Sequence, residues 1–175
     1  MITIQQATPM EAQLIADIGA KSFIESHGHS GPVTDIESYV SMKFALPVVA
    51  EELTNPDNIF HIIYYQGRAA GYSKIIFNSP HPLINDAHVT KLERLYLLKE
   101  FYGFKLGLAL FEYITDLSKK ANQTGIWLFT WIRNERAVNF YKKAGVEIRG
   151  NADFKISATH ANPNHIMYLH YVQTH

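Results

Sequence analysis

Two glycines near the middle of the chain stand where a strand pattern gives way to a helix pattern. Gly103 and Gly107 follow an alternating apolar run at 88–98 and precede an amphipathic segment that begins at Leu108. Such a turn directs unpaired main-chain N–H groups and the positive end of a helix dipole at one point, so it can bind a phosphate or diphosphate. Tight packing of the turn is the alternative. The spacing matches neither the P-loop nor the Rossmann pattern, so hydrolysis of a nucleoside triphosphate is disfavoured.

Histidine and cysteine are the other residue types that could hold a metal or attack a substrate. The chain has nine histidines and no cysteine. His27 and His29 are separated by one residue, and no histidines show the H-E-x-x-H spacing of a zinc site. The absence of cysteine excludes disulfides, thiolate zinc sites and a cysteine nucleophile, and it is compatible with a reducing cytoplasm. We predict no metal, and we expect the protein to act in the cytoplasm.

The elements that must position these residues follow from hydrophobic periodicity and from turn signals. Capping-box patterns at Thr8–Glu11 and Thr34–Glu37 predict two helix starts, and Gln66-Gly67 between two apolar runs predicts a β-hairpin. A partly looped stretch is expected at 151–164. The expected strands are 1–7, 60–65, 69–77, 88–98, 126–131, 146–156 and 165–172, and the expected helices lie between 8 and about 53, from 108 onward and at 134–144.

Composition limits the class of protein. A chain of 175 residues with 47% apolar and 18% charged residues predicts one compact soluble α/β domain, 1–175. Sixteen basic and sixteen acidic residues leave no global positive field for nucleic acid or anionic lipid. The first residues lack the basic and apolar segments of a signal peptide, and no window approaches about 18 apolar residues. We therefore expect no nucleic-acid partner, no export and no membrane span.

Two segments carry a family resemblance. Residues 92–107, LERLYLLKEFYGFKLG, resemble the acetyl-CoA motif of the GNAT superfamily of N-acetyltransferases, in which a strand is followed by Gln/Arg-x-x-Gly-x-Gly/Ala and a helix. Residues 134–146, NERAVNFYKKAGV, are similar to that superfamily's Asn-x-x-Ala-x-x-Phe-Tyr-x-x-x-Gly-Phe. The resemblance implies an α/β (α+β) fold with a mixed, mostly antiparallel central sheet of about six to seven strands flanked by helices. It also implies a splayed strand pair at the acetyl-CoA site.

The first motif departs from the superfamily pattern at two positions. Tyr102 stands at the opening Gln/Arg position, and Lys105 stands at the first glycine. Because the turn works mainly through main-chain N–H groups, Lys105 is tolerable if it has helical φ/ψ, and its ammonium can face a phosphate. In the second motif, Val146 replaces the usual phenylalanine, which is a packing change.

The resemblance implies that acetyl-CoA is the co-substrate. The two central strands would splay apart, so that main-chain groups of Leu95 and Leu97 pair with the pantetheine arm and one N–H polarises the thioester carbonyl. Asn134 would bond the pantetheine amides, with helix N-capping as the alternative. The full set of expected cofactor contacts is Leu95, Tyr96, Leu97, Tyr102, Gly103, Phe104, Lys105, Leu106, Gly107, Leu108, Asn134, Tyr141 and Lys143.

The expected catalytic residues are Tyr141 and Glu93. Tyr141 matches the tyrosine that, in the GNAT superfamily, protonates the departing CoA sulfur. A phenol with a pKa near ~10 stays protonated at neutral pH. A buried aromatic pair with Phe140 is the alternative. The acceptor amine must lose a proton, directly or through water, and Glu93 matches a glutamate of the polyamine acetyltransferase branch. A surface carboxylate paired with a neighbouring cation is the alternative for Glu93, and Tyr96 and His88 are weaker candidate bases.

The N-terminal helical stretch resembles the bacterial spermine and spermidine acetyltransferase-like branch. This resemblance implies a primary amine, in particular a polyamine, that attacks directly in a ternary complex. Other readings stay open: a protein N-terminus or lysine, an amino sugar or another small amine as acceptor, a non-catalytic CoA-binding regulatory module, and a nucleotide-phosphate binder. Aromatic residues at 127–131 are compatible with a homodimer interface and equally with core burial. The carboxylates expected to hold a cationic amine are Glu25, Asp35, Glu37, Glu51 and Glu52, although helix carboxylates are usually solvated.

Overall fold

Seven strands form one mixed sheet in the computed structural model, which describes residues 1–172 and so leaves His175 outside the described part. The strand order is β1-β2-β3-β4-β5-β7-β6, and every neighbouring pair is antiparallel except β4 and β5. The predicted α/β fold with a mostly antiparallel sheet is confirmed. The strands are β1 (Ile2–Gln6), β2 (Ile59–Tyr65), β3 (Arg68–Ile76), β4 (Val89–Leu97), β5 (Gly125–Trp131), β6 (Glu147–Lys155) and β7 (Ala161–His170).

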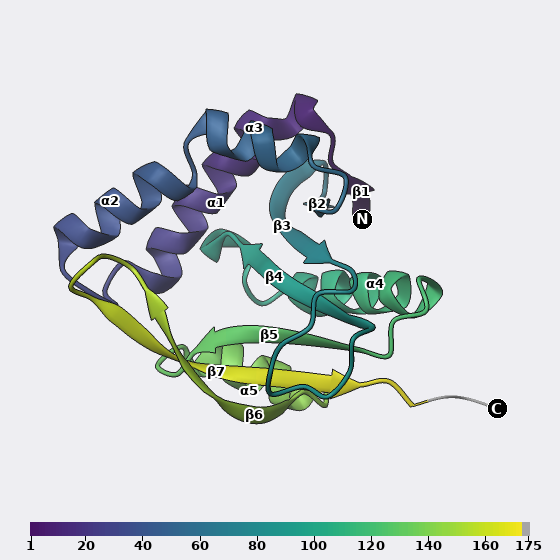
Figure 1. Ribbon diagram of the computed structural model, residues 1–175. Helices are drawn as coiled ribbons and strands as arrows, with labels where there is room; N and C mark the ends of the chain where they lie inside the picture. The colour runs from purple at the N-terminus through teal and green to yellow at the C-terminus, as the bar shows by residue number, and fades with distance from the viewer. Residues whose placement is uncertain (173–175) are drawn as a thin grey trace.

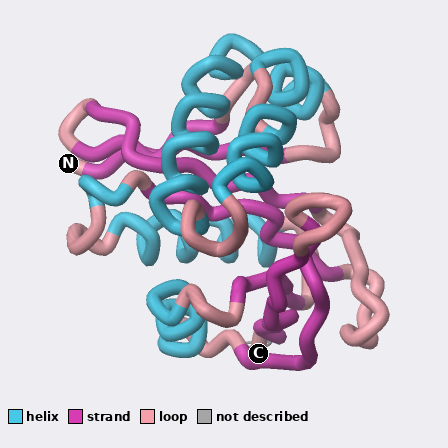
Figure 2. Tube along the Cα trace, turned by 90° about the vertical axis from the view of Figure 1, so that its left-hand side faces the viewer, coloured by secondary structure: helices cyan, strands magenta, loops and turns pink. Residues whose placement is uncertain are grey.

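Helices cover both faces of the sheet (Figures 1 and 2). One face carries α1 (Ala12–His27), α2 (Val33–Lys43) and α3 (Leu46–Thr54), and the other carries α4 (Leu106–Lys120) and α5 (Glu135–Lys143). Short 3-10 turns, η1 (Pro9–Glu11) and η2 (Lys99–Phe101), precede α1 and follow β4.

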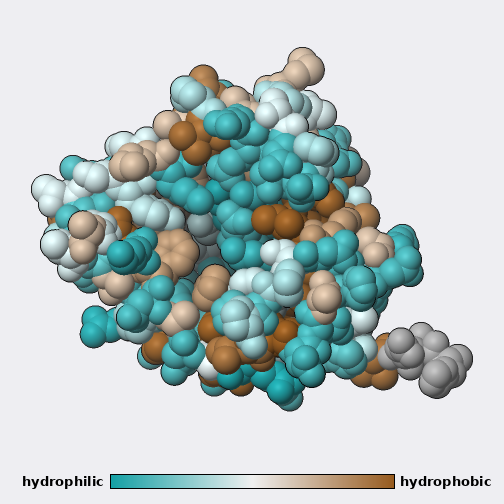
Figure 3. Space-filling view, in the orientation of Figure 1, coloured by the Kyte–Doolittle hydropathy of each residue, from teal (hydrophilic) through white to brown (hydrophobic). Residues whose placement is uncertain are grey.

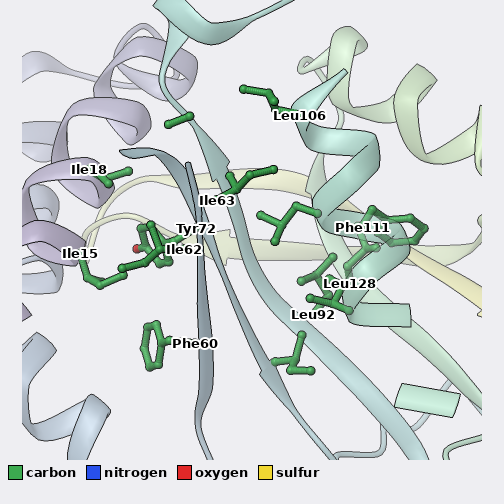
Figure 4. Packing of buried hydrophobic residues seen from close by; sticks show 14 of the residues in the cluster. Ile15, Ile18, Phe60, Ile62, Ile63, Tyr72, Leu92, Leu106, Phe111 and Leu128 are labelled. Atoms are coloured by element: carbon green, nitrogen blue, oxygen red, sulfur yellow. The ribbon is translucent and has the colours of Figure 1, made fainter. Parts of the chain in front are cut away.

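The core consists of apolar side chains on both faces of the sheet, as Figure 4 shows. Ile15 of α1 packs toward Tyr72 on one face, and Phe111 of α4 packs toward Leu92 and Leu128 on the other. Each large apolar side chain that is fully buried stabilises the fold by about 1.5–3 kcal/mol. Packing on both faces therefore fixes the directions of β4 and β5, and these two strands frame the candidate site.

Local sequence patterns predicted most ends of the helices and strands, and the structure corrects two of these predictions. The Thr8 capping box is present, because the Glu11 carboxylate accepts the Thr8 N–H at 2.6 Å and the Thr8 hydroxyl accepts the Met10 N–H at 3.3 Å. The box expected at Thr34 is wrong, since α2 begins at Val33 without a side-chain cap, and Pro32 (φ −56°) precedes it. The loop expected at 151–164 shrinks, because β6 extends to residue 155 and β7 begins at 161, where the two strands pair.

Candidate active site

β4 and β5 are hydrogen-bonded neighbours over only the first part of their lengths. Their parallel pairing runs from Val89↔Gly125 to Lys91↔Trp127, whereas β4 continues to Leu97 and β5 to Trp131. Figure 1 shows the two strands diverging beyond this point. The predicted splay is therefore confirmed. Within the described chain, the facing edges of 92–97 and 128–131 have no strand partner, and unpaired main-chain groups inside a domain need a ligand or water.

A cavity of about 920 Å³ occupies this gap. Its wall comes from β4, β5, α1, α2, the start of α4, most of α5, and residues of β6 and β7. Figure 3 shows the surface hollowed left of centre, where the helical side meets these strands. Every expected cofactor contact except Phe104 lines it, and so does Glu93. Phe104 instead stacks on Tyr65 with ring centroids 4.9 Å apart. Its side chain points to the β2–β3 hairpin, so the cofactor contact expected for Phe104 stays a prediction for its main chain.

The turn into α4 differs from expectation in its handedness. Lys105 is helical but left-handed, with φ 60° and ψ 24°, a conformation that costs a non-glycine residue about 1–2 kcal/mol. This explains why the resembling motif has glycine there. α4 begins at Leu106, so Gly107 lies inside its first turn and not in the preceding turn. Among residues 1–172, no side chain caps the N-terminus of α4, and the first N–H groups of this helix have no intrahelical partner. They are free to bind an anion in the cavity.

Gly107 offers a test of this turn. A Cβ added there would lie 3.8 Å from the Phe140 ring, which is ordinary contact, so the fold itself does not require glycine. Because alanine is favoured over glycine in a helix by about 1 kcal/mol, we expect Gly107→Ala to raise the free energy of unfolding by up to that amount. If the diphosphate rests on this backbone, the same change should weaken acetyl-CoA binding by about tenfold or more.

Urea denaturation and titration calorimetry measure the two effects separately. Gly19→Ala in α1 is the control, because its Cβ would lie 2.5 Å from the Phe44 ring and should therefore destabilise the fold. An unchanged affinity of the Gly107→Ala protein for acetyl-CoA would show that the diphosphate does not approach this residue.

Three cations outside β4 and α2 line the cavity: Lys105, the N-cap of α4, and Arg136 and Lys143 of α5. The Arg136 guanidinium lies 3.4 Å above the centre of the Tyr102 ring. Sequence reasoning included Lys105 and Lys143 but missed Arg136. A signal was present, since a basic residue in the first turn of α5 does not compensate the helix dipole and is better explained by a nearby anion.

Asn134 is the N-cap of α5. Its side-chain oxygen accepts the Ala137 N–H at 3.2 Å, so N-capping, the alternative reading of this residue, is present. Asn134 also lines the cavity. Its amide NH₂ group is a separate donor, so capping leaves it able to bond a carbonyl of a ligand.

Tyr141 is buried and lines the cavity from α5. Its ring packs edge-on against Phe140 and Phe111, with centroids 5.1 and 5.8 Å away. Burial raises the pKa of Tyr141 above the usual value of a phenol, and the neighbouring Tyr96 adds to the increase. The side chain is therefore both a member of an aromatic cluster and a protonated phenol on the cavity wall.

Glu93 lies at an irregularity that the sequence did not reveal. β3 and β4 pair Lys74 with Arg94 and Ile75 with Leu92, so Glu93 is an extra residue in β4, a β-bulge. Its Oε1 accepts from Lys74 Nζ at 2.9 Å. Burial raises the pKa of Glu93, but the bond from Lys74 and the nearby cations outweigh it, so the net pKa is lowered. The paired carboxylate, the alternative reading of Glu93, is therefore present on the cavity wall.

This lowered pKa has a consequence for stability in acid. Because the folded pKa of Glu93 lies below the ordinary 4.5, its contribution to stability is present above that value and is lost as pH falls through the folded pKa. Urea unfolding from about pH 6 to about pH 3 should show a decline in stability that is smaller in Glu93→Gln. Glu147→Gln, at a 74% exposed carboxylate, is the control and should keep the decline. An identical decline in the Glu93→Gln protein would contradict the assignment.

The two weaker candidate bases differ in placement. Tyr96 lines the cavity, and burial raises its pKa to about 12. His88 is exposed, does not line the cavity, and has its Nδ1 3.2 Å from Asn78 Oδ1. Only Tyr96 is therefore in position to contact an acceptor.

The carboxylates expected to form an acidic rim are not assembled on the cavity wall, where only Glu25 of that set is found. The Lys99 main-chain N–H donates to it at 3.2 Å. Glu52 Oε2 instead accepts from Lys74 Nζ and from Arg94 Nη2, both at 2.6 Å. Asp35 accepts from Ser157, and Glu37 and Glu51 are exposed. The expectation of an acidic rim is wrong because these carboxylates pair elsewhere or face solvent.

Comparison with known proteins agrees with this geometry. Residues 22–146 match the sequence profile of the acetyltransferase (GNAT) family. The chain belongs to this family. This GNAT protein is accordingly an acetyl-CoA-dependent N-acetyltransferase.

Its relatives and structural neighbours cover most of the chain. An uncharacterized N-acetyltransferase of Mycobacterium tuberculosis is 27% identical over 152 residues, 87% of this chain and 93% of that protein. One of Lactobacillus delbrueckii subsp. lactis is 25% identical over 145 residues, covering 83% and 84%. The PaiA N-acetyltransferase from Thermoplasma acidophilum, solved in complex with coenzyme A, superposes with a TM-score of 0.75 at 18% identity, covering 98% and 99%. An N-acetyltransferase from Staphylococcus aureus gives 0.67 at 11% identity, covering 97% and 98%. The structural neighbours show that the fold is shared.

Three structural observations bear on the remaining expectations for this GNAT acetyltransferase. Across residues 1–172, no helix combines the length and apolar character that a membrane span requires. In the same described part, His, Asp and Glu side chains nowhere gather in groups of three that could hold a metal. Trp127 and Trp131 of β5 are buried within the chain itself, so their burial does not depend on a partner. A homodimer stays an untested prediction.

Proposed function

We propose that this GNAT acetyltransferase moves the acetyl group of acetyl-CoA to a primary amine by direct attack in a ternary complex. The supporting observation is a single cavity to which the β4–β5 gap, the uncapped start of α4 and Tyr141 all contribute. Its volume of about 920 Å³ is large enough for a pantetheine arm and a small acceptor together. The chain has no cysteine, so no cysteine acyl-enzyme can form.

Acetyl-CoA supplies the acetyl group as an activated thioester. The amine nitrogen forms a bond to the carbonyl carbon, and the C–S bond breaks. Main-chain N–H groups of β4 beyond the splay stabilise the charge that develops on the carbonyl oxygen. Tyr141 gives its proton to the departing sulfur, and the amine proton leaves toward Glu93. Solvent then returns a proton to Tyr141 and takes the one that the amine released.

Because Glu93 is ion-paired, we infer that it passes the amine proton on and does not keep it. A carboxyl group whose pKa is lowered below 4.5 is ionised at neutral pH and does not retain a proton there. We propose that Glu93 orients a water molecule that receives the amine proton and passes it to solvent.

The polyamine acceptor predicted from the sequence stays a prediction. A polycation is best held by several carboxylates. Glu25 and Glu93 are the carboxylates on the cavity wall, and Lys74 already pairs with Glu93. The charges of the cavity therefore give a polyamine little support, and a protein N-terminus or lysine, an amino sugar or another small amine stay open.

Two measurements test the proposed function. Titration calorimetry should detect binding of acetyl-CoA and a much weaker response to ATP. Release of free CoA thiol, followed across a panel of amines, should depend on the amine. A protein that ignores acetyl-CoA would contradict the proposal. A protein that binds acetyl-CoA but releases no thiol with any amine would be a CoA-binding regulatory module.

A further inference from the structure

The cavity wall away from α4 carries more positive than negative charge. Lys43 of α2 and Lys91 and Arg94 of β4 line this part, and Glu93 is the carboxylate beside them. Lys91 Nζ lies over the rings of Trp127 and Phe129, at 5.3 and 5.6 Å from their centres. Such an excess of cations is unexpected for a site that would bind a polycation, because like charges repel.

The ion pairs behind the wall leave the ammonium of Lys43 incompletely paired. Glu52 is bonded to Lys74 and Arg94, and Glu93 is bonded to Lys74. The ammonium of Lys43 lies 4.0 Å from Glu93 Oε1, which is too long for a hydrogen bond. Burial and the neighbouring Arg94 lower the pKa of Lys43, as expected for a cation whose surroundings do not compensate its charge.

Arg94 lies enclosed behind this part of the wall. Its side chain is 1% exposed, Nη2 bonds Glu52, and among the described residues neither Nε nor Nη1 has a hydrogen-bond partner. The hydroxyl of Tyr72, on the neighbouring strand β3, is buried beside the Arg94 guanidinium and faces it. These Arg94 nitrogens are enclosed, so the cation that a ligand can reach here is the Lys43 ammonium, whose side chain is 34% exposed. A carboxylate is the acceptor that suits an incompletely paired ammonium.

We propose that the acceptor is a small amine that also carries a carboxylate, and that Lys43 binds this carboxylate while the amine faces the thioester. The inference rests on the proposed function and names its substrate class. Tyr39 and Lys43 stand at i and i+4 on α2 and both line the cavity, and the buried residues Ile36 and Val40 anchor the helix. Lys43 is thus held by a packed helix and not by a loop.

The position of Glu93 limits the distance between the amine and the carboxylate of the acceptor. Oε1 of Glu93, the residue proposed to orient the proton-accepting water, lies 4.0 Å from the Lys43 ammonium. An acceptor whose amine reaches this water while its carboxylate reaches Lys43 has a short spacer between the two groups, as α-, β- and γ-amino acids do. Phe23, Phe129 and Trp131 line the same space and provide apolar surface for a side chain.

The test compares amino acids with the amines that remain when their carboxyl group is removed. Glycine, L-leucine, L-phenylalanine, β-alanine and 4-aminobutyrate are each paired with the corresponding decarboxylated amine, and putrescine and spermidine represent polyamines. Release of CoA thiol is measured for the unmodified chain, for Lys43→Met and for Lys120→Met, a control at an exposed lysine of α4 that does not line the cavity.

We expect the unmodified chain to prefer at least one amino acid over its decarboxylated partner and over both polyamines. Lys43→Met should lower kcat/KM for that amino acid about ten- to a hundredfold, mainly through KM, and leave alkylamines within about twofold. Acetyl-CoA binding, unchanged in calorimetry, verifies that the variant is folded.

The possible failures are distinguishable. Preference for alkylamines or polyamines, or an equal loss for both members of a pair in Lys43→Met, would overturn this inference and leave the acetyltransferase function standing. Binding of acetyl-CoA without acetylation of any amine would overturn both.

Discussion

Tyr141→Phe is expected to lower kcat by about 10²- to 10⁴-fold, the range that general acid catalysis contributes, while acetyl-CoA affinity stays within about twofold. The change removes one hydroxyl and keeps the ring, so the edge-on contacts with Phe111 and Phe140 persist. Burial keeps the phenol of Tyr141 protonated at neutral pH, so this side chain can donate a proton to the departing thiolate. Phenylalanine has no such proton to donate. Steady-state thiol release and titration calorimetry give the two quantities independently.

Tyr113→Phe is the matched control. Tyr113 lies on α4, is 38% exposed and does not line the cavity, so its hydroxyl should not affect kcat. An unchanged kcat in Tyr141→Phe would remove Tyr141 from the mechanism. A loss of acetyl-CoA affinity with unchanged kcat would make Tyr141 a packing residue of the pantetheine site.

Glu52→Gln is expected to lower the free energy of unfolding by about 3–5 kcal/mol, the cost of breaking a buried ion pair from one side. Glu52 Oε2 lies 2.6 Å from both Lys74 Nζ and Arg94 Nη2, whose side chains are only 5% and 1% exposed. Without its charge, these two buried cations retain Glu93 as their only nearby carboxylate among the described residues. The pair also links α3 to the sheet, so the loss should appear as a cooperative shift in urea denaturation.

Glu51→Gln tests whether this loss is specific. Glu51 is the exposed neighbour of Glu52 on the same helix, and its substitution should change stability by no more than about 0.5 kcal/mol. Equal effects at the two positions would show that the buried pairs contribute little. A small effect of Glu52→Gln alone would mean that water or another group replaces the lost charge.

Local patterns in the sequence predicted much of the fold and the cofactor half of the site. The hairpin was predicted because Gln66 and Gly67 suit a turn that needs positive φ, and both residues have it, at 50° and 78°. The turn into α4 and the start of α5 were identified because their motifs are contiguous segments whose residues act on nearby groups of the same segment. The candidate contacts of Tyr102, Lys105 and Asn134 follow from that contiguity.

The acceptor half depends on residues far apart in the chain. The β4 bulge at Glu93 is a property of pairing with β3, and periodicity within β4 does not reveal it. Glu52 and Arg94 meet across 42 positions, and their pairing turned a predicted rim carboxylate into a half-buried counter-ion. Lys43 gave no signal in the sequence, because a lysine near the end of an amphipathic helix is usually solvated.

The sequence by itself determined the fold family, the cofactor and the tyrosine that we propose as the proton donor, because these depend on short-range motifs and on hydrophobic period. Tertiary structure alone decided which charges face the acceptor. An ionisable group has a sign, a partner and a pKa only once α2, α3, β3 and β4 are packed together, since burial and neighbours at a few ångströms set all three. That packing pairs Glu52 and Glu93 with buried cations and leaves Lys43 facing the cavity.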